Sequence, residues 1–82
     1  MLGPKINIIS PKNGDRIESE TLVIRGETKN VTSLSLDGRT IFTDEKGLFQ
    51  ERLLLYSGYN ILELKARDRF GREIKKILEL VY

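Results

Sequence analysis

The chain has 82 residues, which is the length of one domain with a single hydrophobic core. It contains no cysteine and no histidine, so disulfides, thiol nucleophiles, the usual near-neutral base and the preferred zinc ligands are absent. The formal charge is +2, from 14 basic and 12 acidic side chains whose signs alternate along most of the chain. This composition excludes most enzyme classes and identifies no partner.

We expect no targeting or membrane segment within this sequence. No apolar run approaches the roughly 18 residues of a membrane span, and residues 1–5 are too short for a signal peptide. We expect one domain over residues 1–82, with residues 1–4 as a disordered or linker start. Any signal or anchor that exports the protein is expected to lie outside this chain.

Short apolar runs with a period of two, separated by turn residues, predict β-strands along the whole chain. Residues 6–8 begin the first strand, and residues 10–15 form a loop because they include Pro11 and an Asn-Gly pair. Residues 22–27 form the second strand, followed by a polar connection over residues 28–30. The first third of the chain therefore has no predicted helix.

Two turn patterns organise the middle of the chain. Asp37-Gly38 separates residues 34–36 from residues 40–42 and predicts a type I′ hairpin, because both central positions of that turn need positive φ. An aspartate first and a glycine fourth, as in residues 44–47, predict a type I turn with a glycine bulge. The strand that follows carries Phe49, Leu53 and Leu55.

The last third contains the clearest alternation, over residues 62–67, and then a second Asp-to-Gly turn at residues 68–71. A final strand with Ile74, Leu78, Leu80 and Tyr82 is the expected partner. A helix over residues 72–82 is the local alternative, because this segment has good helix formers and apolar residues at helical spacing. Six to seven antiparallel strands predict an all-β fold, an immunoglobulin-like β-sandwich.

The order of these patterns resembles a known family. The most specific part is Gly47-x-Phe49 followed by Gly58-x-Asn60-x-Leu62-x-Leu64-x-Ala66-x-Asp68, and the likeness covers nearly the whole chain. It resembles the bacterial immunoglobulin-like domains related to the glucodextranase B domain. Arg72, where that family often has Asn, and the charged final strand are departures from its pattern.

The resemblance implies a noncatalytic structural, spacer or display module of a bacterial surface-exposed or secreted protein, and not an enzyme. It implies an extracellular or cell-surface location, with other domains of a larger parent protein or neighbouring surface proteins as partners. No cofactor or metal is expected, nucleic acid is not the expected ligand, and the expected state is a monomer. The resemblance implies nothing about a specific ligand.

The last hairpin carries the one marked charge asymmetry. Its basic residues are opposed only by Asp68 and Glu73, and Phe70 stands at its tip. Such a cluster attracts an anionic polymer or glycan, although lysine and arginine also protect exposed strand edges from pairing. The candidate ligand-binding residues are Lys65, Arg67, Arg69, Phe70, Arg72 and Lys75, together with the aromatic pair Tyr56 and Tyr59.

Three other readings have less support. Asp37, Asp44, Glu45 and Asp68 could gather around calcium, but aspartate at the start of a turn usually bonds the backbone instead. Glutamate pairs such as residues 18 and 20, or 51 and 63, could be cast as a glycosidase pair, but no sequence feature frames a cleft. Edge pairing of residues 77–82 between copies would make the domain self-associate.

Overall fold

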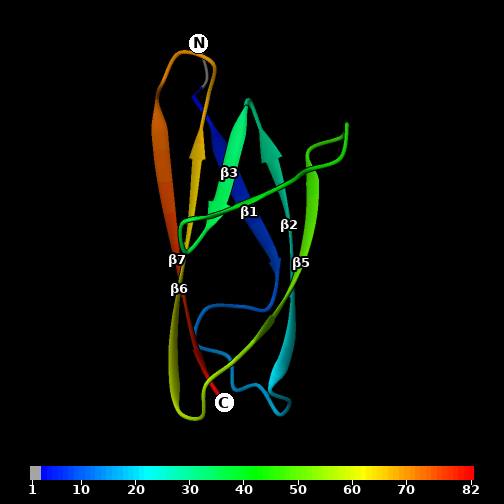
Figure 1. The fold of residues 1–82 in the computed structure, drawn as a ribbon, viewed down its shortest axis with the longest axis vertical. Helices are drawn as coiled ribbons and strands as arrows, with labels where there is room; N and C mark the ends of the chain where they lie inside the picture. Colours follow the sequence, from blue (N-terminus) through cyan, green and yellow to red (C-terminus); the bar gives the residue numbers. More distant parts are fainter. Residues whose placement is uncertain (1–2) are drawn as a thin grey trace.

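The computed structural model describes residues 3–82, and these residues contain seven strands and no helix. The strands are β1 (Lys5–Ser10), β2 (Thr21–Lys29), β3 (Ser33–Leu36), β4 (Arg39–Ile41), β5 (Leu48–Leu54), β6 (Tyr59–Arg67) and β7 (Glu73–Val81). They form two antiparallel sheets in the orders β1-β2-β5 and β4-β3-β6-β7 (Figure 1). The predicted all-β, immunoglobulin-like sandwich of six to seven antiparallel strands is confirmed, with seven strands in residues 3–82.

The core lies between the two sheets because each strand turns every second side chain inward. In β6 the buried positions are Asn60, Leu62, Leu64 and Ala66, in strict alternation with more exposed ones. The full apolar core is Ile6, Leu22, Ile24, Leu34, Leu36, Ile41, Phe49, Leu55, Leu62, Leu64, Ala66, Leu78 and Leu80. One such core is what a chain of this length can build.

The predicted turns have the backbone conformations that their sequences require. Asp37 and Gly38 have φ values of 49° and 83°, so both central positions of the hairpin between β3 and β4 are left-handed, as in a type I′ turn. Gly47 and Gly71 also have positive φ, and the amide of each donates to the carbonyl of the aspartate three residues earlier. Both Asp-to-Gly patterns therefore close turns.

The helix considered for residues 72–82 is wrong. This segment is β7, which pairs with β6 in register from Tyr59↔Val81 to Arg67↔Glu73. Ile77 is exposed while Leu78 is buried, which is the alternation of a strand. Pairing with a long neighbouring strand overrides the local helix propensity.

Element ends differ slightly from the predictions. β2 continues to Lys29, through residues predicted as a connection, because the Thr28 amide donates to the carbonyl of Gly47. β4 ends at Ile41 and β5 at Leu54, so Leu55 is buried beyond the end of its strand. At the start of the chain, Met1 and Leu2 lie outside the described residues, and Pro4 is buried.

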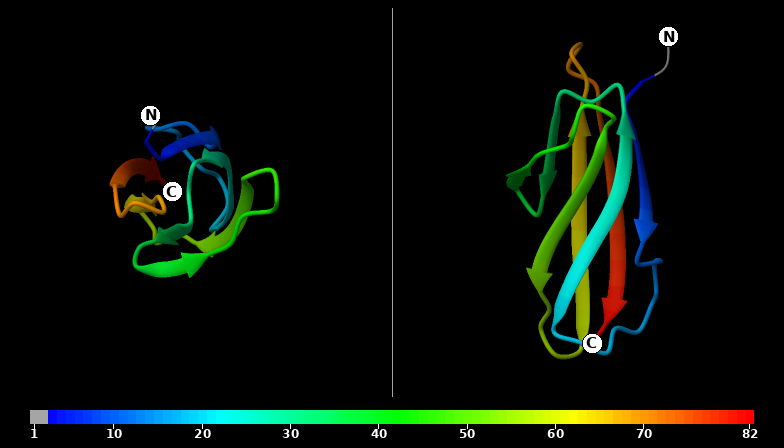
Figure 2. Two further views of the ribbon diagram at one scale, coloured as in Figure 1. Left: turned by 90° about the horizontal axis from the view of Figure 1, so that it is seen from above. Right: turned by 90° about the vertical axis from the view of Figure 1, so that its right-hand side faces the viewer.

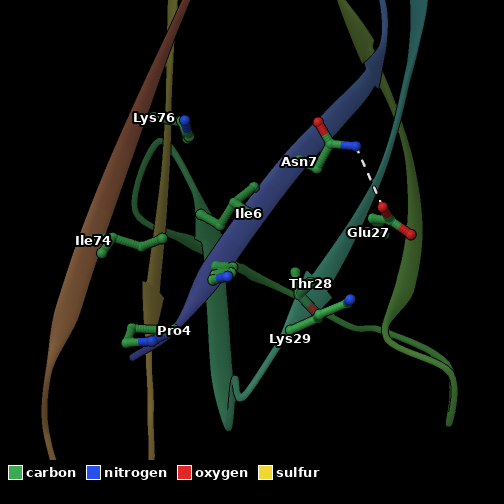
Figure 3. Close-up of a pocket in the computed structure, with 9 residues that line it drawn as sticks. Pro4, Ile6, Asn7, Glu27, Thr28, Lys29, Ile74 and Lys76 are labelled. Carbon is green, nitrogen blue, oxygen red and sulfur yellow. Dashed lines mark hydrogen bonds between the residues drawn. The ribbon is translucent and has the colours of Figure 1, made fainter. Parts of the chain in front are cut away.

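The open side of the sandwich between β1 and β7 is closed only in part. Residues 14–17 lie along the end of β7, with hydrogen bonds from the amide of Gly14 to the carbonyl of Glu79 and from that of Ile17 to the carbonyl of Val81. Farther up, Ile6 and Ile74 project into the gap between the strands (Figure 3). The edge of residues 79–81 is therefore occupied, which argues against self-association through that part of the chain.

The chain enters and leaves the domain at opposite ends. The principal dimensions are 40 × 20 × 19 Å, and the strands run along the long axis. β1 begins near one end and β7 finishes near the other (Figures 1 and 2). The domain is therefore a short rod, and the two ends of the described chain lie at opposite poles. Within residues 3–82 there is no helix that is long and apolar enough to cross a membrane.

Candidate functional site

The candidate residues separate into two groups at opposite ends of the rod. The turn between β6 and β7, residues 68–72, lies at the pole where the described chain begins. Tyr56 and Tyr59 lie around the start of β6, at the pole where the chain ends. The structure therefore does not bring the aromatic pair and the basic residues into one site.

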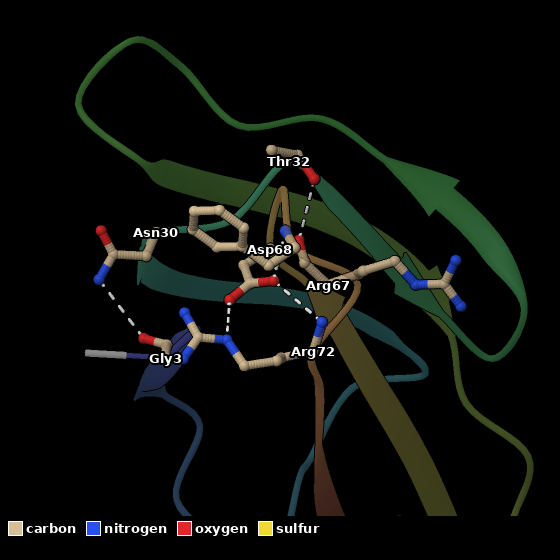
Figure 4. A network of polar contacts seen from close by, with 7 residues as sticks. Gly3, Asn30, Thr32, Arg67, Asp68 and Arg72 are labelled. Carbon is tan, nitrogen blue, oxygen red and sulfur yellow. Dashed lines mark hydrogen bonds and ion pairs between the residues drawn. The ribbon is translucent and has the colours of Figure 1, made fainter. Parts of the chain in front are cut away.

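Asp68 organises the hairpin tip. Its side chain is only 4% exposed, and its Oδ1 accepts hydrogen bonds from the amides of Phe70 and Arg72, each at 2.9 Å. Its Oδ2 accepts from Nε of Arg72 at 2.6 Å (Figure 4). Burial raises the pKa of Asp68, but the hydrogen bonds and charge of Arg72 outweigh it, so the pKa lies below its ordinary value.

Arg67 and Arg69 at the hairpin have partners as well. Nη2 of Arg67 lies 2.8 Å from Oε2 of Glu73, and this hydrogen bond with its charge holds the Glu73 pKa below its ordinary value. The guanidinium carbons of Arg69 and Arg72 lie 4.9 and 5.5 Å from the centroid of the Phe70 ring. Phe70 is thus a platform for two arginines, although 56% of it stays exposed.

Lys65 and Lys75 form the remaining charged pair. They lie directly opposite each other in β6 and β7, on the outer face of the four-stranded sheet. The hydrogen-bonded pairs of this ladder are the even-numbered residues, as the reciprocal bonds between Gly58 and Tyr82 show. Lys65 and Lys75 therefore form a non-hydrogen-bonded pair, in which side chains come closest and like charges repel.

The tip also borders a surface hollow of about 430 Å³, lined by residues 30–32 and by Asp68, Arg69, Phe70 and Arg72. Thr32 Oγ1 donates to the carbonyl of Arg67 at 3.1 Å, and Asn30 Nδ2 donates to the carbonyl of Gly3 at 3.4 Å (Figure 4). Guanidinium groups beside an open aromatic ring suit an anion or a planar ligand.

Tyr56 and Tyr59 share a second hollow of about 390 Å³, whose lining includes Leu54, Ile61 and Arg39. The exposed fractions of the two tyrosines are 84% and 60%. Glu79, whose carboxylate interacts with the Tyr59 hydroxyl, raises the pKa of Tyr59 above its ordinary value. Both rings therefore remain open to solvent at the end of the domain.

Asn60 holds the loop that carries these tyrosines, a role that was not predicted from the sequence. It is buried, its Oδ1 accepts from the Tyr56 amide at 2.9 Å, and its Nδ2 donates to the Tyr56 carbonyl at 2.8 Å. The sequence signal was the polar residue at an inward position of a regular alternation. A buried amide at such a position needs hydrogen-bond partners.

The turn aspartates bind backbone amides. Oδ1 of Asp44 accepts from the amides of Lys46 and Leu48, and Oδ1 of Asp37 accepts from the amide of Glu63. Within residues 3–82, no group of three or more acidic residues is arranged to hold a metal ion. Of the glutamates considered for a glycosidase pair, Glu51 forms an ion pair with Arg39, in which Oε1 lies 3.3 Å from Nη2.

Comparison with known proteins agrees with the fold. A family model described as glucodextranase, domain B, matches residues 4–81. No curated protein matches the chain significantly.

Two solved structures have the same fold at low identity. A crystal structure of an engineered protein is 18% identical with a TM-score of 0.71, and the match covers 95% of this chain and 20% of that one. This chain thus spans about a fifth of that protein. The fibronectin(III)-like modules of CbhA from Clostridium thermocellum are 15% identical, with a TM-score of 0.67 and 94% of each chain covered. The domain B model covers nearly the whole chain, so this protein belongs to the glucodextranase domain B family of immunoglobulin-like, noncatalytic accessory domains.

Proposed function

We propose that this domain is a structural spacer or display module of a surface-exposed or secreted bacterial protein. This proposal rests on the position of the two chain ends, which lie at opposite poles of a body 40 Å long. Copies or neighbouring domains joined through these points extend a polypeptide along one line. The family supports this role because its members are accessory domains.

A direct tandem of two copies tests the spacer role. The second copy adds up to about 40 Å to the maximum dimension measured by small-angle X-ray scattering if the rods are joined end to end. Two copies folded back side by side would add only about the width of the rod and would contradict the proposal. Turnover of any substrate by the isolated domain would also contradict it.

The surface location needs a separate measurement. An epitope tag on the exposed loop at Glu45 reports whether intact cells display the domain to antibody and added protease. The expected result is labelling of intact cells. Labelling only after the cells are lysed would contradict the proposed location and leave the spacer geometry unaffected.

One observation favours a second function, the binding of an anionic polymer or glycan at the last hairpin. Lys65 and Lys75 face each other across the ladder and share the nearby Glu73 carboxylate, which also pairs with Arg67, so a phosphate, sulfate or carboxylate group between them supplies further negative charge. Replacing both lysines by serine should abolish binding to an anionic cell-wall polymer and leave the fold intact. Unchanged binding by this variant, or no binding by the native domain, would remove the second function.

A further inference from the structure

The edge of β7 is used only in its second half. The carbonyl of Glu79 accepts from the Gly14 amide, and the amide of Val81 donates to the Asp15 carbonyl. The loop segment runs parallel to β7 at this point, with a bridge between Arg16 and Val81. This edge therefore already holds one extended segment of the chain itself.

The first half of the same edge has no such partner. Even-numbered residues of β7 bond to β6, so the amides and carbonyls of Glu73, Lys75 and Ile77 point away from it. Within residues 3–82, the outward backbone groups of Lys75 and Ile77 bond to no other segment. Two consecutive ladder positions thus remain open directly above the occupied ones.

β1 forms the facing wall of the gap. The Thr28 amide points to β5, so the odd-numbered residues of β2 bond to β1, and the backbone groups of Ile6 and Ile8 point away from β2 at the open edge of its sheet. Two adjoining hollows of about 390 and 360 Å³ lie in this gap, and both include Ile6 and Lys76 in their lining. Figure 3 shows Ile74 and Ile6 converging on the gap from its two sides, with Lys76 farther along β7.

The charge around this gap is positive. Four lysines line the two hollows, namely Lys5, Lys12, Lys29 and Lys76. The acidic residue in their lining is Glu27, whose carboxylate accepts a hydrogen bond from Asn7 at 3.3 Å. Lys76 alternates with Ile74 and Leu78 on the core-facing side of β7, so a segment laid along this edge would cover its ammonium group.

We propose that the gap between β1 and the first half of β7 binds an extended acidic peptide, which adds a strand to the four-stranded sheet next to residues 73–77. Its backbone bonds to the open groups of Lys75 and Ile77, as residues 14–17 do to Glu79 and Val81. A carboxylate of the peptide pairs with Lys76. An uncharged strand would cover that ammonium without a partner, which is costly, so the gap selects an acidic segment over an apolar one or a second copy of β7.

The first experiment titrates the isotope-labelled domain with two blocked heptapeptides, one alternating glutamate with valine and one alternating lysine with valine. The acidic peptide is expected to give saturable amide shifts at residues 73–77 and at Ile6 and Ile8. It should also slow solvent exchange of the Lys75 and Ile77 amides. The basic peptide is expected to give no saturable shift.

Variants separate the backbone contribution from the charge. Lys75→Pro removes an outward backbone amide and leaves the bonds to β6 in place. Edge strands tolerate proline at such a position. This variant should abolish binding. Lys75→Ser keeps that amide and should retain most of the affinity. Lys76→Glu should weaken binding about tenfold or more, equivalent to one charged contact, whereas Lys46→Glu, on the exposed turn before β5, should change it little.

Several outcomes would overturn the proposal. These are equal binding of the basic peptide, no saturation at millimolar peptide, or shifts confined to the hairpin tip or to the tyrosine hollow. Unchanged binding by Lys76→Glu would overturn it as well. That variant replaces an exposed side chain, so it tests the proposal even if Lys75→Pro fails to fold. None of these outcomes bears on the spacer role, which the scattering of the tandem tests separately.

Discussion

Residues 44–47 and residues 68–71 form turns with the same pattern, an aspartate first and a glycine fourth. In both turns the aspartate Oδ1 accepts two backbone amides and the glycine has a φ of 83° or 84°. The surroundings differ. In the first turn, a Cβ on Gly47 would collide with the Thr28 carbonyl oxygen, whereas a Cβ on Gly71 would meet nothing within 4 Å.

The aspartates show the opposite order. Asp44 is exposed, while Asp68 is 4% exposed and paired with Arg72 at 2.6 Å. The first turn is therefore fixed to the domain through its glycine and the second through its aspartate. One local pattern gives the same backbone twice, but the tertiary neighbours decide which of its residues the fold depends on.

The largest expected effect on stability comes from replacing each glycine by alanine. Gly47→Ala combines a left-handed backbone with a backbone collision and should lower the free energy of unfolding by about 2–4 kcal/mol. Gly71→Ala has only the backbone strain and should cost about 1–2 kcal/mol. Urea unfolding of both variants measures the difference. Equal losses would show that the Thr28 contact does not fix the first turn.

Replacing each aspartate by asparagine should reverse the order, with the larger loss of stability in the second turn. Asp68→Asn keeps an acceptor for the amides but removes the charge that faces Arg72, whereas Asp44→Asn removes a charge at an exposed turn. Asp44→Asn should lower the free energy of unfolding by less than about 1 kcal/mol. Asp68→Asn should lower it clearly more, and its Tm should fall further. In an Arg72→Gln background the Asp68→Asn effect should shrink. An undiminished effect would assign it to the turn alone.

The smallest expected effect is the pH dependence of the second turn. The folded-state pKa values of Asp68 and Glu73 lie below their ordinary values, so their stabilisation is present above the unfolded pKa and is lost as pH falls through the folded one. Tm should therefore decline below a pH of about 4. Asp68→Asn should flatten this decline more than Glu73→Gln, and equal slopes would contradict the primary role of Asp68.

Much of the fold could be predicted because its signals are local. The hairpin at Asp37-Gly38 and both Asp-to-Gly turns depend on a few adjacent residues whose φ values the sequence constrains. Residues 72–82 were ambiguous between helix and strand, and only the partner strand resolved them. The extension of β2 to Lys29 depends likewise on a bond to Gly47.

The candidate sites were predicted less well, because they depend on which segments meet. The basic hairpin is contiguous in the sequence, so its charge could be found there, but its pairing with Asp68 and Glu73 required the register of β6 and β7. The separation of Tyr59 from that hairpin required the direction of β6. The contact of Asn13 with Glu79 joins residues 66 positions apart, and no local pattern announces it.

The placement of the two ends has a mechanical consequence. A pull between the poles draws β1 toward one end and β7 toward the other, while residues 14–17, just after β1, lie parallel to the end of β7. The force then acts parallel to the strands on the backbone hydrogen bonds that join Gly14, Asp15 and Ile17 to β7, so these bonds must break together. The hydrogen bonds of a hairpin pulled open from one end break one after another. The loop that closes the side of the sandwich thus acts as a shear clamp between the two ends of the chain.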